Sequence, residues 1–598
     1  EALQEAGLQP KAPPCFWNRL SRAASCAIDR HLAPSAPLSE PMVAQTVSKL
    51  LAPGGRLLIS SSMPIRDLDF FAKPSADPLQ APLQPPAANR GASGIDGVIS
   101  TAVGVCLGSQ APGTLVIGDV ASLVDLNALQ QLAGPEAPAL TIVLVNNGGG
   151  GIFSFLPIGK HTDVLSPFFS EPHATDFEDV SRAFGLSYTL CCSLEDLEAA
   201  YALSQNQPPS SGPSIIEVRP AYSFEENVSL HRAIGQDVTA AVRQDLLSRV
   251  KLCWTLSLGT SQAPTVVLLH GWLGEKADWT EVSKCLVEEH QHSVLCVDLP
   301  GHGQTQVGSG TAPDAWEAVL FSLPVIVELL VELFDHLHLG PVVLAGYSLG
   351  GRVAMAFAES YPKKCVGLVA LSANPGLQSP GEQRQRWLQD QKQAKQLLDA
   401  NFEEFLDRWY AAPLWGGLKE REPEVYSRML AKRRTVRPQM AALSLLGSSL
   451  ARQPPCWSPP CPLWYAYGEL DAKFAAIGRD FAEKSSSAGP KVHVRALPKI
   501  GHAVVEEAPL EVAKFIAEAA EAFGSSSSAR PREESRLRLE SAWSEPIQVM
   551  LKAPLLLARG EPLHHREGIL LVLQGRSGAD GPLAAGLGEV TPLPQFHK

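Results

Sequence analysis

The sequence predicts a multidomain protein of the α/β class, in which helices cover parallel β-sheets. Runs of apolar, β-branched residues such as 115–117, 140–145 and 342–344 have the length and composition of buried strands. Helical patterns separate these runs, and strands that alternate with helices form parallel sheets. The chain of 598 residues is also long enough for about three or four domains.

The composition is that of a globular protein and argues against several classes of function. The net charge of −12 and the lack of a long basic run argue against a nucleic-acid-binding surface. No apolar run reaches the length of a membrane span. The 11 cysteines lack paired C-x-x-C motifs with zinc spacing, so we expect reduced thiols in an intracellular compartment. The chain starts at Glu1, and we expect any targeting peptide to lie upstream.

The first predicted domain covers residues 1–222 and opens with two helices. Residues 15–32 have helical spacing. Ser39 suits the N-cap of the next helix, with Pro41 in its first turn. The Pro- and Ala-rich run 73–88 has no periodicity and is predicted to be a surface loop.

Polar residues follow two buried strands of this domain. The strand 115–117 runs into Asp119, and the strand 140–145 runs into Asn147. Because parallel strands end at the same edge of a sheet, these side chains are expected to lie together. Their oxygens are ligands that Mg²⁺ prefers, and the glycine run 148–151 would let backbone approach a diphosphate closely. An ordinary loop with structural glycines is the alternative.

This arrangement resembles the cofactor motif of thiamine-diphosphate (ThDP)-dependent enzymes, although Val120 stands where a further glycine is usual. The resemblance is closer to one family, the 2-succinyl-5-enolpyruvyl-6-hydroxy-3-cyclohexene-1-carboxylate (SEPHCHC) synthases, and it covers most of residues 15–220. The motifs that carry it are S-M-P-I-R-D at 62–67, N-R-G-A-S-G-I-D at 89–96 and G-G-I-F-S at 150–154.

The resemblance implies addition of decarboxylated 2-oxoglutarate to isochorismate, with ThDP and Mg²⁺ as cofactors. The implied Mg²⁺ ligands are Asp119, Asn147 and the Gly149 carbonyl. The implied cofactor contacts also include Ile95, as the wedge that bends ThDP, with Gly118, Ile152 and Phe153. The implied carboxylate-binding residues are Ser62, Arg66 and Arg90. Surface ion pairs are the alternative for the arginines. The family's activating glutamate comes from an N-terminal domain that is missing here, so we expect half of a catalytic site.

After a polar connector at 223–261, residues 262–523 are predicted to form a second α/β domain. Its central motif is G-Y-S-L-G at 346–350, which follows a Val-rich strand and precedes a helical pattern. This is the context that a nucleophile elbow requires, and it predicts a catalytic serine at Ser348. A plain turn is the alternative.

Two later residues complete a predicted catalytic triad with Ser348. Asp471 follows a strand and His502 follows the last strand, in the chain order that the α/β-hydrolase fold uses. Asp471 can orient His502, which can accept the serine proton. The backbone N–H groups of Trp272 and Leu349 are the predicted oxyanion donors. The turn histidines His270 and His302 are predicted to be structural.

This domain resembles 2-succinyl-6-hydroxy-2,4-cyclohexadiene-1-carboxylate (SHCHC) synthase, which eliminates pyruvate from SEPHCHC. The motifs that carry the resemblance lie at 346–355, 374–377 and 409–413, and the Arg-rich run 376–450 is predicted to be a helical cap. The implied substrate contacts are Tyr347, Arg352, Trp409, Arg433 and one of Arg384 and Arg386. The resemblance makes Ser348 a general base rather than an acylated nucleophile.

The last two predicted segments are a flexible Ser-rich linker at 524–535 and a partial domain at 536–598. Residues 566–573 and 586–594 are predicted strands of a small sheet. They resemble the start of the α+β capping domain of o-succinylbenzoate synthase, an enolase-type enzyme. The catalytic barrel is missing, so this segment is expected to be inactive.

Together the three parts resemble the PHYLLO-type multifunctional proteins of phylloquinone and menaquinone biosynthesis. The resemblance implies a plastid location, small-molecule substrates, the missing N-terminal domain as partner and possible homo-oligomers. We therefore expect an internal piece of a multifunctional enzyme. The alternatives are a general esterase fused to a ThDP-type domain, and a non-catalytic scaffold.

Overall fold

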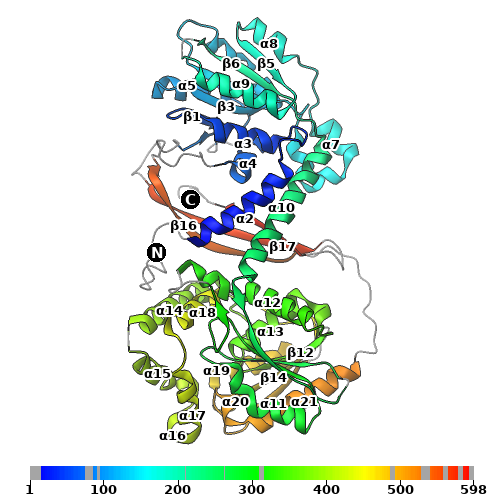
Figure 1. The fold of residues 1–598 in the computed structure, drawn as a ribbon, viewed down its shortest axis with the longest axis vertical. Coiled ribbons are helices and arrows are strands. Elements are labelled where there is room, and N and C mark those ends of the chain that lie inside the picture. Colours follow the sequence, from blue (N-terminus) through cyan, green and yellow to red (C-terminus); the bar gives the residue numbers. More distant parts are fainter. Residues whose placement is uncertain are drawn as a thin grey trace. The chain divides into compact units, whose positions relative to one another are not determined.

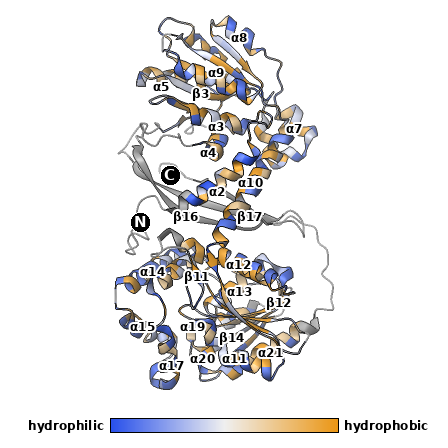
Figure 2. Ribbon diagram, viewed as in Figure 1, coloured by the Kyte–Doolittle hydropathy of each residue, from blue (hydrophilic) through white to orange (hydrophobic). Residues whose placement is uncertain are grey.

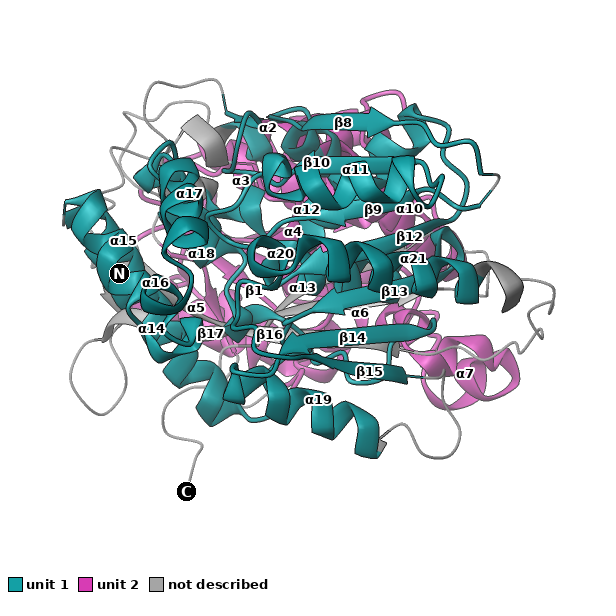
Figure 3. Cartoon of the chain, turned by 90° about the horizontal axis from the view of Figure 1, so that it is seen from below, with its two compact units in different colours: residues 1–21, 242–598 teal, residues 22–241 magenta. Residues whose placement is uncertain are grey.

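The computed structural model describes residues 15–73, 85–89, 94–208, 211–261, 263–308, 315–399, 401–484, 492–526, 539–555, 563–576 and 583–590. The chain divides into two compact units (Figure 3). One covers residues 22–241, and the other covers residues 242–598 together with residues 1–21. None of the helices in the described ranges has the length and apolarity needed to cross a bilayer. The predicted substrate residue Arg90 and most of the predicted Ser-rich linker lie outside the described residues.

The unit at 22–241 is built on a six-stranded parallel sheet with the strand order β2-β1-β3-β4-β6-β5 (Figure 1). Its strands are β1 (Arg56–Ile59), β2 (Ala87–Ala88), β3 (Gly113–Gly118), β4 (Leu140–Val145), β5 (Ser187–Cys191) and β6 (Ser214–Val218). The α-helices up to residue 247 are α2 (Cys15–His31), α3 (Glu40–Leu50), α4 (Met63–Phe71), α5 (Val98–Ser109), α6 (Asp119–Val124), α7 (Thr162–Phe168), α8 (Phe177–Ala183), α9 (Leu194–Asn206) and α10 (Phe224–Leu247).

Both faces of this sheet are buried, which explains why its strands are apolar throughout. Val143 of β4 packs with α3 and α9, whereas the next residue, Leu144, packs with α5 on the other face. Successive side chains of a strand point to opposite faces, so both positions must be apolar when helices cover both sides. The predicted parallel α/β domain is confirmed.

The C-terminal unit contains a seven-stranded sheet with the order β15-β14-β13-β12-β9-β10-β8, in which only β8 pairs antiparallel to its neighbour. Its strands are β8 (Cys253–Ser257), β9 (Val266–Leu269), β10 (Val294–Asp298), β12 (Val342–Tyr347), β13 (Cys365–Leu371), β14 (Leu463–Gly468) and β15 (Val492–Leu497), and a separate pair is β7 (Val250–Lys251) with β11 (Gln306–Val307). The helices around the sheet are α11 (Thr280–Glu288), α12 (Leu323–His336), α13 (Leu349–Ser360), α19 (Ala472–Lys484), α20 (Val504–Glu507) and α21 (Pro509–Ser526). Figure 2 shows apolar residues on the strands of this sheet.

The cap is inserted between β13 and β14, as the Arg-rich run predicts. Its helices are α14 (Pro380–Asp399), α15 (Phe402–Tyr410), α16 (Leu418–Arg421), α17 (Pro423–Arg433) and α18 (Pro438–Gly447). Their apolar residues share one core with helix α12, through Val325 and Leu329, and with Leu273 and Ala503 from the loops of the sheet domain. The cap therefore packs on the loops that carry the predicted catalytic residues.

The predicted polar connector at 223–261 is more ordered than the sequence suggested. It contains the long helix α10 and strand β8, which forms the edge of the seven-stranded sheet. Helix α10 buries a few apolar residues, among them Val228 and Ile234. Its many polar residues make the segment as a whole look polar, so these apolar positions do not stand out in the sequence. The sheet of the C-terminal unit thus begins before the predicted boundary at residue 262.

Near the C-terminus the structure contains a three-stranded antiparallel sheet. Its strands are β16 (Leu539–Leu555), β17 (Leu563–Arg576) and β18 (Leu583–Val590), in the order β16-β17-β18. The two predicted strands overlap β17 and β18, so the prediction of a small sheet agrees with the structure.

Candidate functional sites

The first candidate site lies where β3 and β4 end. These strands are parallel neighbours, and Gly118 of β3 is in register with Val145 of β4. The residues that follow, Asp119 and Asn147, therefore emerge at the same edge of the sheet. The structure brings together the two side chains that the sequence predicted as metal ligands.

Asp119 is 2% exposed and is held by backbone donors. Its Oδ2 accepts hydrogen bonds from the N–H groups of Gly148 and Gly149, at 2.8 and 2.9 Å, and its Oδ1 accepts one from Val120 N–H at 2.7 Å. His173 Nε2 lies 3.2 Å from Asp119 Oδ2. Burial raises the pKa of Asp119, because desolvation outweighs these hydrogen bonds. A cation beside the carboxylate would restore its preference for the charged form.

The glycine run is required by close packing of two backbone segments. Gly149 has a φ of +144°, and a Cβ there would lie 2.1 Å from the carbonyl oxygen of Ser170. A Cβ at Gly150 would lie 2.6 Å from the carbonyl oxygen of Phe169. The Gly149 carbonyl, the third predicted ligand, accepts a 2.9 Å hydrogen bond from Gly151 N–H.

Asn147 supplies the observation that best fits a cation. Its Nδ2 donates to Glu40 Oε1 at 2.9 Å, while its Oδ1 is buried and has no partner among the described residues. A buried amide oxygen without a donor is costly unless something else coordinates it. With the Asp119 carboxylate at the same strand edge, this donor set suits a hard cation such as Mg²⁺.

A cavity of about 450 Å³ opens at this edge and gathers the predicted cofactor and substrate residues. Every predicted member in the described part of the chain lines it, namely Ser62, Arg66, Ile95, Gly118, Asp119, Asn147, Gly149, Ile152 and Phe153. Ser62 has a positive φ of 78°, and its carbonyl accepts a 2.6 Å hydrogen bond from Arg66 Nη1. Three motifs that are far apart in sequence thus form one pocket.

Two carboxyl groups in the cavity wall were not singled out from the sequence. Glu40 and Asp67 are both buried, and Asp67 Oδ1 lies 2.8 Å from His231 Nε2. Burial and the nearby negative charge of Asp67 raise the pKa of Glu40 to about 7. In the sequence, Glu40 stands directly after the predicted N-cap Ser39, and that pattern indicated only the start of a helix. In the structure the Ser39 side chain makes no capping hydrogen bond.

The second candidate site is built on the turn between β12 and α13. Ser348 occupies it with φ 50° and ψ −105°, a strained backbone conformation for a residue other than glycine. A Cβ at Gly346 would lie 2.2 Å from the carbonyl oxygen of Gly350, and a Cβ at Gly350 would lie 2.0 Å from that of Leu269. Both motif glycines are therefore needed sterically, as in a nucleophile elbow.

His502 and Asp471 form the predicted pair beside this turn. His502 Nδ1 lies 2.7 Å from Asp471 Oδ2, and the side chains are 4% and 1% exposed. The imidazole packs against the ring of Tyr347, next to Ser348 in the chain, with 5.4 Å between ring centroids. With Nδ1 bonded to the carboxylate, Nε2 is left to exchange a proton with substrate or serine.

The loop after β9 lies against the serine turn, where an oxyanion hole is expected. A Cβ on Gly271 would lie 2.8 Å from the Tyr347 ring and 3.5 Å from Ser348 Cβ. The predicted donors Trp272 and Leu349 flank this contact, and Trp272 Nε1 donates to the Ala441 carbonyl of the cap at 3.1 Å. The turn histidines bond to backbone, His270 Nδ1 to Gly271 O at 2.8 Å and His302 Nδ1 to Pro300 O at 3.0 Å, in line with structural roles.

Arg352 lies one helical turn after Ser348 and is only 9% exposed. Its Nε donates to Gln453 Oε1 and its Nη2 to the Ser448 carbonyl, each at 2.5 Å. Among the described residues, no carboxylate lies within ion-pair distance of it. Burial, together with the positive charge of Arg386, lowers the pKa of Arg352 to about 9. The guanidinium is buried without an ion-pair partner among the described residues, and the Asp390 carboxylate, beyond ion-pair distance, offsets only part of the shift.

The remaining predicted cap residues differ in their surroundings. Arg386 forms a 2.8 Å ion pair with Asp390, whereas Arg384 is exposed, and only Arg386 lies close enough to Arg352 to affect its charge. The Trp409 ring packs edge-on against Trp272, with 5.0 Å between centroids. Trp409 therefore reaches the predicted oxyanion loop.

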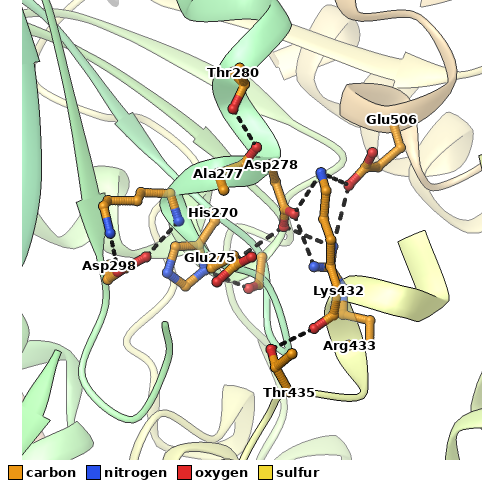
Figure 4. A network of polar contacts seen from close by, with 12 residues as sticks. His270, Glu275, Ala277, Asp278, Thr280, Asp298, Lys432, Arg433, Thr435 and Glu506 are labelled. Atoms are coloured by element: carbon orange, nitrogen blue, oxygen red, sulfur yellow. Dashed lines mark hydrogen bonds and ion pairs between the residues drawn. The ribbon is translucent and has the colours of Figure 1, made fainter. Parts of the chain in front are cut away.

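Arg433 belongs to a buried ion cluster with Asp278, Glu506 and Lys432 (Figure 4). Its Nη1 and Nη2 donate to Asp278 Oδ1 and Oδ2, at 3.0 and 2.7 Å, and Glu506 lies 3.6 Å from Nη2. Lys432 lies 3.4 Å from Asp278 and 3.3 Å from Glu506. Arg433 is thus paired bidentately with Asp278 within the protein, and its contact with substrate stays a prediction.

The sequence is similar to one protein family and to a group of curated proteins. Residues 266–515 match the model of the alpha/beta hydrolase family. The chain is 44% identical over 218 residues to a SEPHCHC synthase of Rubrobacter xylanophilus, and 40% identical over 236 residues to that of Chlorobium limicola. These matches cover 36% and 39% of this chain and 36% and 38% of those proteins. The chain thus spans little more than a third of the length of these curated relatives.

Solved structures resemble the hydrolase part at low identity. MenH from S. aureus is 24% identical, with a TM-score of 0.40, covering 45% of this chain and 98% of that one. A thermophilic esterase from Thermogutta terrifontis is 23% identical, with a TM-score of 0.38, covering 46% and 94%. By the family model and the sequence matches, the chain contains an α/β-hydrolase domain at residues 266–515 and, over about 36% of its length, a region homologous to SEPHCHC synthases.

Proposed function

We propose that the hydrolase domain eliminates pyruvate from SEPHCHC to give SHCHC, the reaction implied by its sequence resemblance. The observation that carries this proposal is the buried Arg352. A guanidinium that has only neutral partners, one helical turn beyond the serine, suits an anionic substrate group. A pocket for neutral esters has no need of such a charge.

In this reaction Ser348 acts as a general base. Its Oγ accepts a proton from a carbon of the substrate ring and passes its own proton to His502 Nε2, while Asp471 holds the imidazole through Nδ1. The new carbon–carbon double bond forms as the bond between the ring carbon and the enolpyruvyl oxygen breaks. The leaving group takes up a proton from His502 and is released as pyruvate. The N–H groups of Trp272 and Leu349 stabilise negative charge on a substrate oxygen.

Ester hydrolysis is the second candidate for this domain, because the elbow and the His502–Asp471 pair serve it equally well. The two reactions differ in their intermediates and products. Purified protein is incubated with SEPHCHC, and pyruvate is followed through lactate dehydrogenase; p-nitrophenyl esters provide the comparison. We expect rapid pyruvate release, feeble ester turnover and no acyl-enzyme by mass spectrometry. An acyl burst with efficient ester turnover and no pyruvate release would establish the hydrolase instead.

For the N-terminal unit we propose binding of ThDP with Mg²⁺ as part of a SEPHCHC synthase site. Asp119, Asn147 and the Gly149 carbonyl would hold the metal, with Ile95, Ile152 and Phe153 against the cofactor. When bound, ThDP would provide the nucleophilic carbon chemistry that addition to isochorismate requires. Arg66 and Ser62 would orient a substrate carboxylate at the cavity wall. The matched region spans little more than a third of the length of the SEPHCHC synthases, so we expect it to supply only part of their site.

Isothermal titration calorimetry of ThDP against the protein, with Mg²⁺ and with excess EDTA, tests this assignment. We expect binding in the first case and little in the second. Equal affinity in both would contradict the metal site. SEPHCHC formation by the chain without any added domain would contradict the half-site.

A further inference from the structure

We propose that Glu40 is a positioning residue for the metal site, which fixes the Asn147 amide so that its oxygen faces the cation. This inference rests on the proposed ThDP and Mg²⁺ binding and adds a residue to it. Glu40 is the first residue of α3, a helix that packs on the sheet, so its side chain starts from a rigid element.

The two ends of the Asn147 amide have different surroundings. Asn147 Nδ2 donates to Glu40 Oε1 at 2.9 Å, and an unprotonated carboxylate oxygen accepts hydrogen bonds, so this contact places the Nδ2 end of the amide against Glu40. The Oδ1 end must then point away from Glu40. That oxygen is buried and has no partner among the described residues, and Asn147 lines the same cavity as Asp119. The metal ligand is therefore presented in one orientation only.

The cost of placing Glu40 there indicates a purpose beyond packing. Glu40 is 6% exposed, and the carboxyl of Asp67 faces it from α4. His231 bonds to Asp67 at 2.8 Å and offsets one of the two acids, while Asp119 adds a third carboxyl to the surroundings of Glu40. An apolar residue would fill this position without that electrostatic penalty. Outer partners that orient a ligand are a regular part of metal sites.

The neighbouring asparagine offers a matched control. Asn146 Nδ2 donates to Glu217 Oε1, also at 2.9 Å, and Glu217 is fully buried on β6. Glu217 and Glu40 are thus buried glutamates of the same unit that bind consecutive asparagine amides. Asn146 is not a predicted metal ligand, so loss of Glu217 removes a similar contact from an amide outside the predicted ligand set, although it also frees Tyr188 and Arg219.

The test measures Mg²⁺ affinity by calorimetry in saturating ThDP for the wild type, E40L, E40Q and E217L. We expect E40L to weaken Mg²⁺ binding by about 10- to 100-fold, the usual cost of losing an outer partner of a ligand. E40Q keeps an oxygen that can accept from Asn147 Nδ2 and should stay within about threefold of the wild type. E217L should also keep its affinity. Thermal unfolding without metal reports on the fold of each variant, and E40M replaces E40L if the latter does not fold.

A double-mutant cycle separates orientation from general loosening. With Asn147 already changed to Ala, E40L should cause no further loss of Mg²⁺ affinity, because its target is gone. Unchanged affinity in E40L, equal losses in E40L and E217L, or additive losses in the cycle would each overturn the role of Glu40 while leaving the cofactor site intact. Absence of Mg²⁺-dependent ThDP binding in the wild type would overturn the cofactor site itself.

Discussion

Replacement of Arg352 by methionine tests the proposed elimination directly. The substitution removes a buried positive charge but keeps a long side chain in the same space. The loss of the Gln453 and Ser448 contacts costs about 1–3 kcal/mol for each acceptor left unpaired. Removal of a buried charge that has no ion-pair partner offsets a loss of this size, since desolvating an ion costs several kcal/mol. We therefore expect a folded protein whose stability changes little.

The effect on substrate should be larger and selective. A hydrogen bond between ions or with one ion contributes about 1.5–3 kcal/mol, which corresponds to roughly 10- to 100-fold in affinity. We expect kcat/KM for pyruvate release from SEPHCHC to fall by that factor, mostly through KM, while any turnover of neutral esters is unchanged. The exposed Arg384, changed to Met, serves as the control. Equal losses for SEPHCHC and a neutral ester, or an effect of Arg384→Met as large as that of Arg352→Met, would refute the assignment of Arg352 to a substrate carboxylate.

Three further outcomes are expected. Ser348→Ala should lower pyruvate release by about 10²–10⁴-fold, the usual contribution of a general base, with SEPHCHC binding retained in calorimetry; normal turnover would remove Ser348 from the mechanism. Asp119→Asn should abolish the Mg²⁺ dependence of ThDP binding, and unchanged calorimetric traces with and without EDTA would contradict that. Arg433→Met should cost about 3–5 kcal/mol in urea unfolding, because it removes the bidentate partner of the buried Asp278 and leaves only the longer contact with Lys432. Burial raises the pKa of Asp278, but the charge of Arg433 outweighs burial and lowers it. The stabilisation from this ion pair is therefore present above the ordinary pKa of an aspartate and is lost as the pH falls below that value. A wild type whose stability does not change between pH 5 and 3 would argue against the pair.

The parts of the sites that could be predicted are those fixed by strand ends and short motifs. Asp119 and Asn147 each follow a buried strand, and the parallel pairing of these two strands brings both residues to the same edge of the sheet. The order of Ser348, Asp471 and His502 likewise follows from the connectivity of the fold. Such positions depend on local sequence and on topology, both of which leave a pattern in the chain.

Contacts between distant segments left no such pattern. Glu40 meets Asn147 across 107 positions, and Arg433 meets Asp278 across 155. A glutamate at a helix start and an arginine in a basic cap helix have ordinary surface interpretations until the packing is known. Helix α10 was missed for another reason, since its polar residues conceal the spacing of the few apolar ones that are buried.

The ion cluster of Figure 4 has a mechanical consequence for the hydrolase domain. Asp278 belongs to the segment after β9, Glu506 to α20 just after His502, and Lys432 and Arg433 to the end of cap helix α17. Swinging this end of the cap outward would separate charges that are almost fully buried, at a cost of several kcal/mol. The ion cluster therefore holds the end of helix α17 on the sheet domain. Any opening of the cap that admits substrate should leave this end in place and move the other cap helices around it.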